Sequence, residues 1–126
     1  MIREDYLMRQ IEIVARTLAK LIFNKDTAEY MIIDYQKLGD TDFLHERLVK
    51  LIAELKIDEA ENLLFEKIEE ELEADATSRG YLEVALDFYS RLNELSNQKL
   101  EDCGFEREEI DEGIREVSRL YGIDII

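Results

Sequence analysis

The chain has 126 residues, of which 46% are apolar and 37% are charged, so it can bury a core and is not a disordered chain. It contains five glycines and no proline, which disfavours a β-rich fold and predicts helices joined by short connections. The net charge of −15 disfavours binding to nucleic acid or to anionic membranes, and it favours basic partners.

The acidic residues are concentrated in the C-terminal half. Residues 1–56 carry nine basic and ten acidic side chains, whereas residues 57–126 carry seven and twenty-one. Solubility alone explains such a charge, and attraction of a basic partner is the alternative. The single cysteine, Cys103, excludes an internal disulfide and fits the cytoplasm. We expect neither a signal peptide nor a membrane-spanning segment.

Apolar residues recur every three or four positions over 4–23, which predicts an amphipathic helix. Its inward stripe consists of Leu7, Ile11, Val14, Leu18, Leu21 and Ile22. A second, thinner apolar line consists of Ile2, Tyr6, Met8 and Ile13. This line either packs against a neighbouring helix or forms a homodimer interface through the N-terminal helix.

A second helix is predicted over 27–38, because Asp26 followed by Glu29 is a helix-start pattern. Its inward positions are Ala28, Met31, Ile32, Tyr35 and Leu38. Gly39 is predicted to end this helix in the left-handed conformation. Two further helices are predicted over 42–55 and 58–74, and their short connection makes them antiparallel neighbours.

The stretch 79–103 is predicted to be the central helix, because its apolar residues cover too much of the circumference for a helix with one solvated face. These residues are Val84, Ala85, Leu86, Phe88, Tyr89, Leu92 and Leu95. Ser96, Asn97 and Gln98 weaken the helix locally. We nevertheless expect continuity, because Leu100 stays in phase with the earlier apolar positions.

Gly104 is predicted to end the central helix, and a last helix is predicted over 106–121 with its end at Gly122. The motif at 57–60 recurs at 110–113, and each copy places a small residue where another helix can approach. Coincidence in a Glu-rich chain is the alternative. The whole chain, 1–126, is therefore predicted to be one all-α domain of six helices, arranged as stacked hairpins or as an irregular bundle.

Within residues 41–72, Ala60 and Leu64 have the spacing of the small and large residues in the second helix of a tetratricopeptide repeat. The segment resembles a degenerate copy, since the repeat's other marker residues are missing. The resemblance implies a surface that binds a peptide or protein. The stretches IREDYLMRQI, DFYSRLNEL, GFEREEI and LYGI make the chain similar to an uncharacterised Firmicutes family of short acidic helical proteins, some labelled tetratricopeptide-like. That family has no assigned reaction or ligand, so it implies none here.

Residues that could carry out chemistry are few. His45 is the only histidine, and Asp42-x-x-His45 has the spacing used in carboxylate-bridged diiron bundles, but a second such motif is missing. We therefore expect His45 to have a surface or packing role. Cys103 lies beside Glu101 and Asp102, whose charges raise the pKa of its thiol and disfavour a thiolate nucleophile. No catalytic, cofactor-binding or metal-binding residue is predicted.

The tyrosines either line a groove or belong to the core with their hydroxyl groups at its rim. They are Tyr6, Tyr30, Tyr35, Tyr81, Tyr89 and Tyr121. The functional prediction is a non-enzymatic, cytoplasmic helical module that binds a protein or peptide. The alternatives are a metal-dependent enzyme that uses carboxylates and an acidic decoy of a basic partner.

Overall fold

The computed structural model describes residues 2–123, and this part of the chain contains six α-helices and no β-strand. The predicted all-α fold class is confirmed. The helices are α1 (Ile2–Phe23), α2 (Asp40–Ala53), α3 (Ile57–Ala74), α4 (Gly80–Glu94), α5 (Asn97–Asp102) and α6 (Arg107–Leu120). Two of the helices predicted from the sequence have no direct counterpart among these six.

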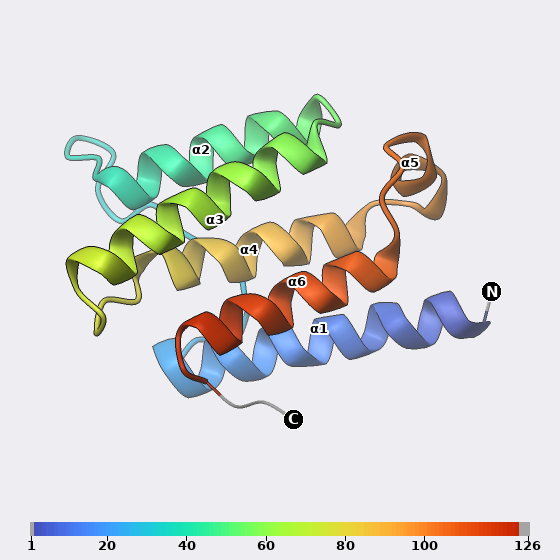
Figure 1. The fold of residues 1–126 in the computed structure, drawn as a ribbon, viewed down its shortest axis with the longest axis horizontal. Helices are drawn as coiled ribbons and strands as arrows, with labels where there is room; N and C mark the ends of the chain where they lie inside the picture. Colours follow the sequence, from blue (N-terminus) through green and yellow to red (C-terminus); the bar gives the residue numbers. More distant parts are fainter. Residues whose placement is uncertain (1, 124–126) are drawn as a thin grey trace.

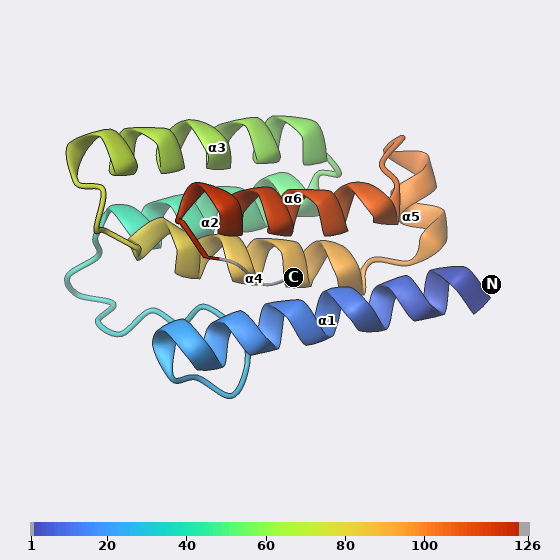
Figure 2. The same cartoon turned by 60° about the horizontal axis from the view of Figure 1, so that its bottom comes forward.

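Helix α4 lies at the centre of the molecule. It contacts α2 and α3 on one side and α1 and α6 on the other (Figures 1 and 2). Its buried residues are Leu82, Val84, Ala85, Leu86, Asp87, Phe88, Tyr89, Leu92 and Asn93. The central position predicted from the apolar pattern is therefore confirmed, as is the neighbouring pair α2–α3, and α4 also packs against α6.

The helix predicted over 79–103 is broken between α4 and α5. The hydroxyl of Ser96 accepts the backbone N–H of Lys99 at 3.1 Å and caps α5. Arg107, at the start of α6, donates to the backbone carbonyls of Asn93 at 2.7 Å and Leu95 at 3.0 Å. A continuous helix would use these two carbonyls itself, so the prediction of continuity is wrong because a side chain from α6 binds them instead.

The helix predicted over 27–38 is absent. Residues 24–39 form a connecting segment without helix or strand, which links α1 to α2 (Figure 2). Burial alternates along the segment: Ala28, Tyr30 and Ile32 are buried or half-buried, and Glu29, Met31 and Ile33 are exposed. A period of two is typical of an extended chain.

Weak helical propensity and one tertiary contact explain this difference. A helix of twelve residues is marginal, and the β-branched side chains of this stretch weaken it further. The N–H of Tyr30 donates to Asp87 of α4 instead of to a carbonyl one turn earlier. Gly39 also differs from the prediction, because its φ of −106° is extended backbone at the start of α2. At the other end of the segment Asn24, which follows α1, is left-handed with φ 53°.

Helix α1 follows most of its predicted stripe. Ile11 and Leu18 are buried, and the half-buried members of the stripe are Leu7, Val14 and Ile22. Leu21 is exposed, contrary to the prediction. In the second apolar line, Tyr6, Met8 and Ile13 are exposed, so none of the helices within residues 2–123 covers them. The side chain of Ile2 lies outside the described residues.

The predicted glycine positions near the C-terminus agree with the structure. Gly104 and Gly122 have φ of +67° and +73° and follow α5 and α6. Gly113 is buried against Tyr89, whose hydroxyl would lie 2.5 Å from an added Cβ.

Helices α2 and α3 form the antiparallel pair expected over 41–72, and its resemblance to a tetratricopeptide repeat stays a prediction.

Candidate functional site

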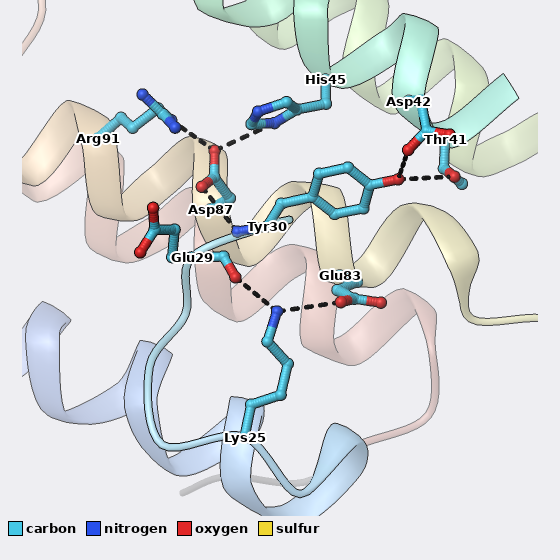
Figure 3. A network of polar contacts seen from close by, with 9 residues as sticks. All are labelled: Lys25, Glu29, Tyr30, Thr41, Asp42, His45, Glu83, Asp87 and Arg91. Carbon is cyan, nitrogen blue, oxygen red and sulfur yellow. Dashed lines mark hydrogen bonds and ion pairs between the residues drawn. The ribbon is translucent and has the colours of Figure 1, made fainter. Parts of the chain in front are cut away.

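Asp87 is a charged side chain in the buried face of α4, with 3% of its surface exposed. Its Oδ1 accepts the backbone N–H of Tyr30 at 2.9 Å (Figure 3). Its Oδ2 accepts Nε of Arg91 at 2.6 Å and faces Nδ1 of His45 at 3.3 Å. We call these four residues the Asp87 network. It connects α4 to α2 and to the connecting segment, and it supplies the donors that a buried carboxylate needs.

Two opposing effects set the pKa of Asp87. Burial alone raises the pKa, because it disfavours the charged form. The hydrogen bonds from His45, Arg91 and the N–H of Tyr30 outweigh burial, so the pKa lies below its ordinary value of 3.8. Asp87 is therefore ionised at neutral pH despite its burial.

Tyr30 extends the network toward the start of α2. Its ring lies against the ring of His45, with 4.7 Å between centroids. Its hydroxyl bonds to Thr41 at 2.9 Å and to the carboxylate of Asp42. Burial, followed by the bond to Asp42, raises the pKa of Tyr30 to about 12. Asp42 also accepts the N–H of Gly39 at 2.9 Å, which fixes the end of the connecting segment.

Lys25 fixes the other end of the connecting segment. Its ammonium group donates to the carbonyl of Glu29 and to the carboxylate of Glu83 on α4, the latter at 3.0 Å (Figure 3). The segment is thus held at its start by Lys25, in its middle by the N–H and the hydroxyl of Tyr30, and at its end by the N–H of Gly39. Although it has no regular secondary structure, it has a defined path along α4.

A cavity of about 590 Å³ lies between α1, the connecting segment and α4, and Asp87 is part of its wall. We call it the α1–α4 cavity. Its lining residues are Met8, Glu12, Arg16, Thr27, Ala28, Glu29, Asp87, Ser90, Arg91, Asn93 and Glu94. Most of these side chains are polar, so a ligand in the cavity would be recognised by hydrogen bonds and charge.

The charges that line the α1–α4 cavity do not balance. Arg16 pairs with Glu12 at 3.6 Å, and Arg91 pairs with Asp87. Glu29 and Glu94 make no ion pair within residues 2–123. The cavity therefore has two carboxylates to offer to a cation that brings its own hydrogen-bond donors.

The chain belongs to a protein family of unknown function. The family, described as a family of unknown function (DUF6483), matches residues 1–122. This agrees with the uncharacterised family expected from the sequence. No curated protein and no solved structure matches the chain. Among residues 2–123, no helix is both long and apolar enough to cross a membrane.

Of the residues considered from the sequence of this DUF6483 member, Asp42 and His45 lie close together around Tyr30, whereas Cys103 lies at the end of α5. Asp42 and His45 lie on α2 but bind different partners, Tyr30 and Asp87 respectively. Within the described range, no three His, Cys, Asp or Glu side chains are grouped to hold a metal ion. Cys103 is half-buried, and burial together with the charge of Asp102 raises the pKa of its thiol, as expected.

The tyrosines do not share one groove. Tyr30, Tyr89 and Tyr121 are buried, with hydroxyl groups that donate to Asp42, Glu61 and Glu71 in turn. Tyr6 and Tyr35 are exposed, and Tyr81 is half-buried. The three buried tyrosines agree with the alternative of core residues with bonded hydroxyl groups.

Sequence reasoning missed Asp87, although a signal was present. An acidic residue stands in the middle of the apolar run from Val84 to Tyr89, in the helix expected to be most buried. A buried acid requires donors from other parts of the chain. Its partners come from positions up to 57 residues away, so the sequence could have indicated Asp87 but not the residues that bind it.

Proposed function

We propose that this protein acts without catalysis and binds a protein or peptide partner, with a basic side chain of the partner entering the α1–α4 cavity. The observation that carries the proposal is the cavity itself, whose wall includes the ionised Asp87 and whose carboxylates Glu29 and Glu94 have no ion-pair partner within residues 2–123. A lysine or arginine would supply the missing positive charge and several N–H donors.

The shape and composition of the cavity support this choice of partner. A cavity of about 590 Å³ is large enough for a long side chain and part of its backbone. Met8 and Ala28 offer apolar contact to the methylene groups of such a side chain. A net charge of −15 adds a long-range attraction that speeds the encounter with a basic partner.

A matched pair of double variants tests the proposal. The first variant, Glu29→Gln with Glu94→Gln, removes the two cavity charges that make no ion pair among the described residues. The control, Glu59→Gln with Glu112→Gln, removes two exposed charges from α3 and α6. The probe is a fluorescein-labelled peptide of eight residues with alternating valine and lysine, and binding is measured by anisotropy. We expect the cavity variant to weaken binding about tenfold and the control less than about twofold.

The same experiment separates this proposal from the acidic decoy. A decoy binds through its overall charge, so both double variants would weaken binding equally, and affinity would fall steeply with salt. Equal effects, or no binding by the wild type, would contradict the cavity proposal. The metal-dependent enzyme is tested by elemental analysis after gentle purification, where stoichiometric metal would contradict a purely binding role.

Self-association is a second proposal, carried by the exposed apolar residues of α1. Tyr6 is 65% exposed and Leu21 is 70% exposed, and Ile13 lies between them along the helix. We propose that this face forms a homodimer interface. Light scattering should then give twice the chain mass of 14.9 kDa, and Ile13→Asp should return the mass to that of one chain. A wild-type monomer at all concentrations would contradict the dimer.

A further inference from the structure

The connecting segment has backbone groups without a hydrogen-bond partner in the described part of the chain. Within residues 2–123, the N–H and C=O groups of Met31, Ile32 and Ile33 take part in no hydrogen bond. The segment spans 24–39, and a connection of this length without regular structure is uncommon in a small domain unless it serves a function. The N–H and C=O groups without partners therefore belong to a long connecting segment, which is a kind of segment that often carries function.

The direction of the free groups follows from the bond at Tyr30. The N–H of Tyr30 points toward Asp87 on α4. In an extended chain, successive N–H groups point to opposite edges, so those of Met31 and Ile33 point away from α4. The side chains of Met31 and Ile33 are 67% and 97% exposed. We call this stretch the Met31–Ile33 edge.

Hydrogen bonds of the flanking residues hold the Met31–Ile33 edge in place. The bonds of Lys25 to Glu83 and of Tyr30 to Asp87 and Asp42 fix the backbone before the edge, and the bond from the N–H of Gly39 to Asp42 fixes the end of the segment after it. A strand that pairs with a fixed edge orders only itself, so less conformational entropy is lost on binding than with a mobile loop. The edge is thus suited to accept another strand.

The charges along the segment indicate what kind of strand it accepts. Residues 26–34, which contain the edge, have three acidic side chains, Asp26, Glu29 and Asp34, and no basic one; the segment's two lysines, Lys25 and Lys37, lie outside this range, and Asp26 pairs with Lys20 at 3.6 Å. A second copy of the chain would bring the same acids opposite these, which opposes pairing. A basic strand complements them, and Glu29 also lines the α1–α4 cavity.

We infer that the partner binds as an extended basic segment that adds a strand to the Met31–Ile33 edge. This inference rests on the proposed function and names the form of its partner. Backbone hydrogen bonds supply affinity, and the acids along the segment select lysine or arginine over acidic side chains. The exposed side chains of Met31 and Ile33 pack against apolar residues of the added strand.

The test uses the valine–lysine peptide and two substitutions at one position. Ile33→Pro removes the N–H of Ile33 from the edge, and it favours an extended conformation at Ile32. Ile33→Ala keeps the N–H and serves as the control. We expect Ile33→Pro to weaken binding about tenfold, because hydrogen bonds to the edge are lost, and Ile33→Ala to weaken it less than about threefold. Thermal unfolding of each variant checks that the fold is intact.

Two further measurements decide the mode of binding. A peptide with N-methylated alternate amides should bind about tenfold more weakly than the unmodified peptide. Amide hydrogen exchange at Met31 and Ile33 should slow when the peptide is added. If Ile33→Pro and the methylated peptide bind normally while the Glu29/Glu94 variant does not, strand addition is wrong and the proposed function stands. If the wild type does not bind the peptide, both are wrong.

Discussion

Two buried charged side chains near α4 have opposite surroundings, and the comparison separates structure from function. Arg107 is 3% exposed and donates to Glu4, to the backbone and side chain of Asn93, to Leu95 and to Asn97. All five N–H groups of its guanidinium are used, so it has nothing left for a ligand. Asp87 is equally buried, and both side chains lie in the wall of a cavity, of about 660 Å³ for Arg107 and about 590 Å³ for Asp87. The difference is that the carboxylate of Asp87 accepts three donors and has an acceptor site left, and that Glu29 and Glu94 in its cavity make no ion pair within residues 2–123. We call Arg107 and its partners the Arg107 network. It is closed, because Arg107 has no N–H left to donate to a ligand, whereas the Asp87 network is open to one.

The largest effect is expected at the closed network. Arg107→Met should lower the free energy of unfolding by about 3–5 kcal/mol, because two buried carbonyls and the side chain of Asn93 lose their donor. Urea unfolding measures the change. The folded fraction should still bind the basic peptide with wild-type affinity. Loss of binding in folded Arg107→Met would show that the two networks do not differ in role.

Asp87→Asn is expected to have a smaller effect on stability and a larger one on binding. It should cost about 2–3 kcal/mol, because three bonds to a charged acceptor become bonds to a neutral one. Amide exchange at Tyr30 should also become faster, since its acceptor is weaker. If Asp87→Asn leaves both urea unfolding and peptide affinity unchanged, Asp87 neither holds the connecting segment nor supports the cavity.

The pH dependence of stability should distinguish the two networks again. The pKa of Asp87 is lowered in the folded state, so its contribution to stability is present above the ordinary value of 3.8 and is lost as the pH falls through the folded value. Unfolding free energies measured between neutral and acid pH should fall less steeply in Asp87→Asn than in wild type. Arg107→Met should keep the wild-type slope, and parallel slopes in all three proteins would contradict this.

The smallest effect is expected for Tyr30→Phe. Loss of the bonds from the hydroxyl to Thr41 and Asp42 should cost about 1 kcal/mol. Because the pKa of Tyr30 is raised to about 12, its contribution is present below the unfolded value of 10.0 and is lost as the pH rises toward 12. The variant should therefore lose less stability than wild type in alkaline urea titrations, and an identical alkaline loss would count against the role of the hydroxyl.

The sequence predicts the helical frame because apolar periodicity reports burial directly. The apolar residues from Val84 to Leu92 place α4 at the centre, and the turn after α2 places α3 beside it. Both errors arise where a distant polar side chain binds the backbone. Arg107 takes the carbonyls that would continue α4, and Asp87 takes the N–H that would begin a helix over 27–38. Such bonds join residues that are not neighbours in the sequence, so the local spacing of apolar residues cannot predict them.

The site was less predictable than the frame for the same reason. His45 was expected to have a surface or packing role, and it packs against Tyr30 while facing Asp87. The α1–α4 cavity combines α1, the connecting segment and α4, and its shape depends on the connecting segment being extended. The helix predicted over 27–38 would have buried Met31 and Tyr35, which are exposed in the structure.

The most direct test of the account is a titration of the isotope-labelled protein with the valine–lysine peptide, followed by backbone amide shifts in NMR. We predict saturable shifts confined to the α1–α4 cavity and the Met31–Ile33 edge, with the largest changes at Glu29, Met31, Ile33 and Arg91. Shifts spread over the acidic surface of α3, or changes that do not saturate, would contradict a defined binding site.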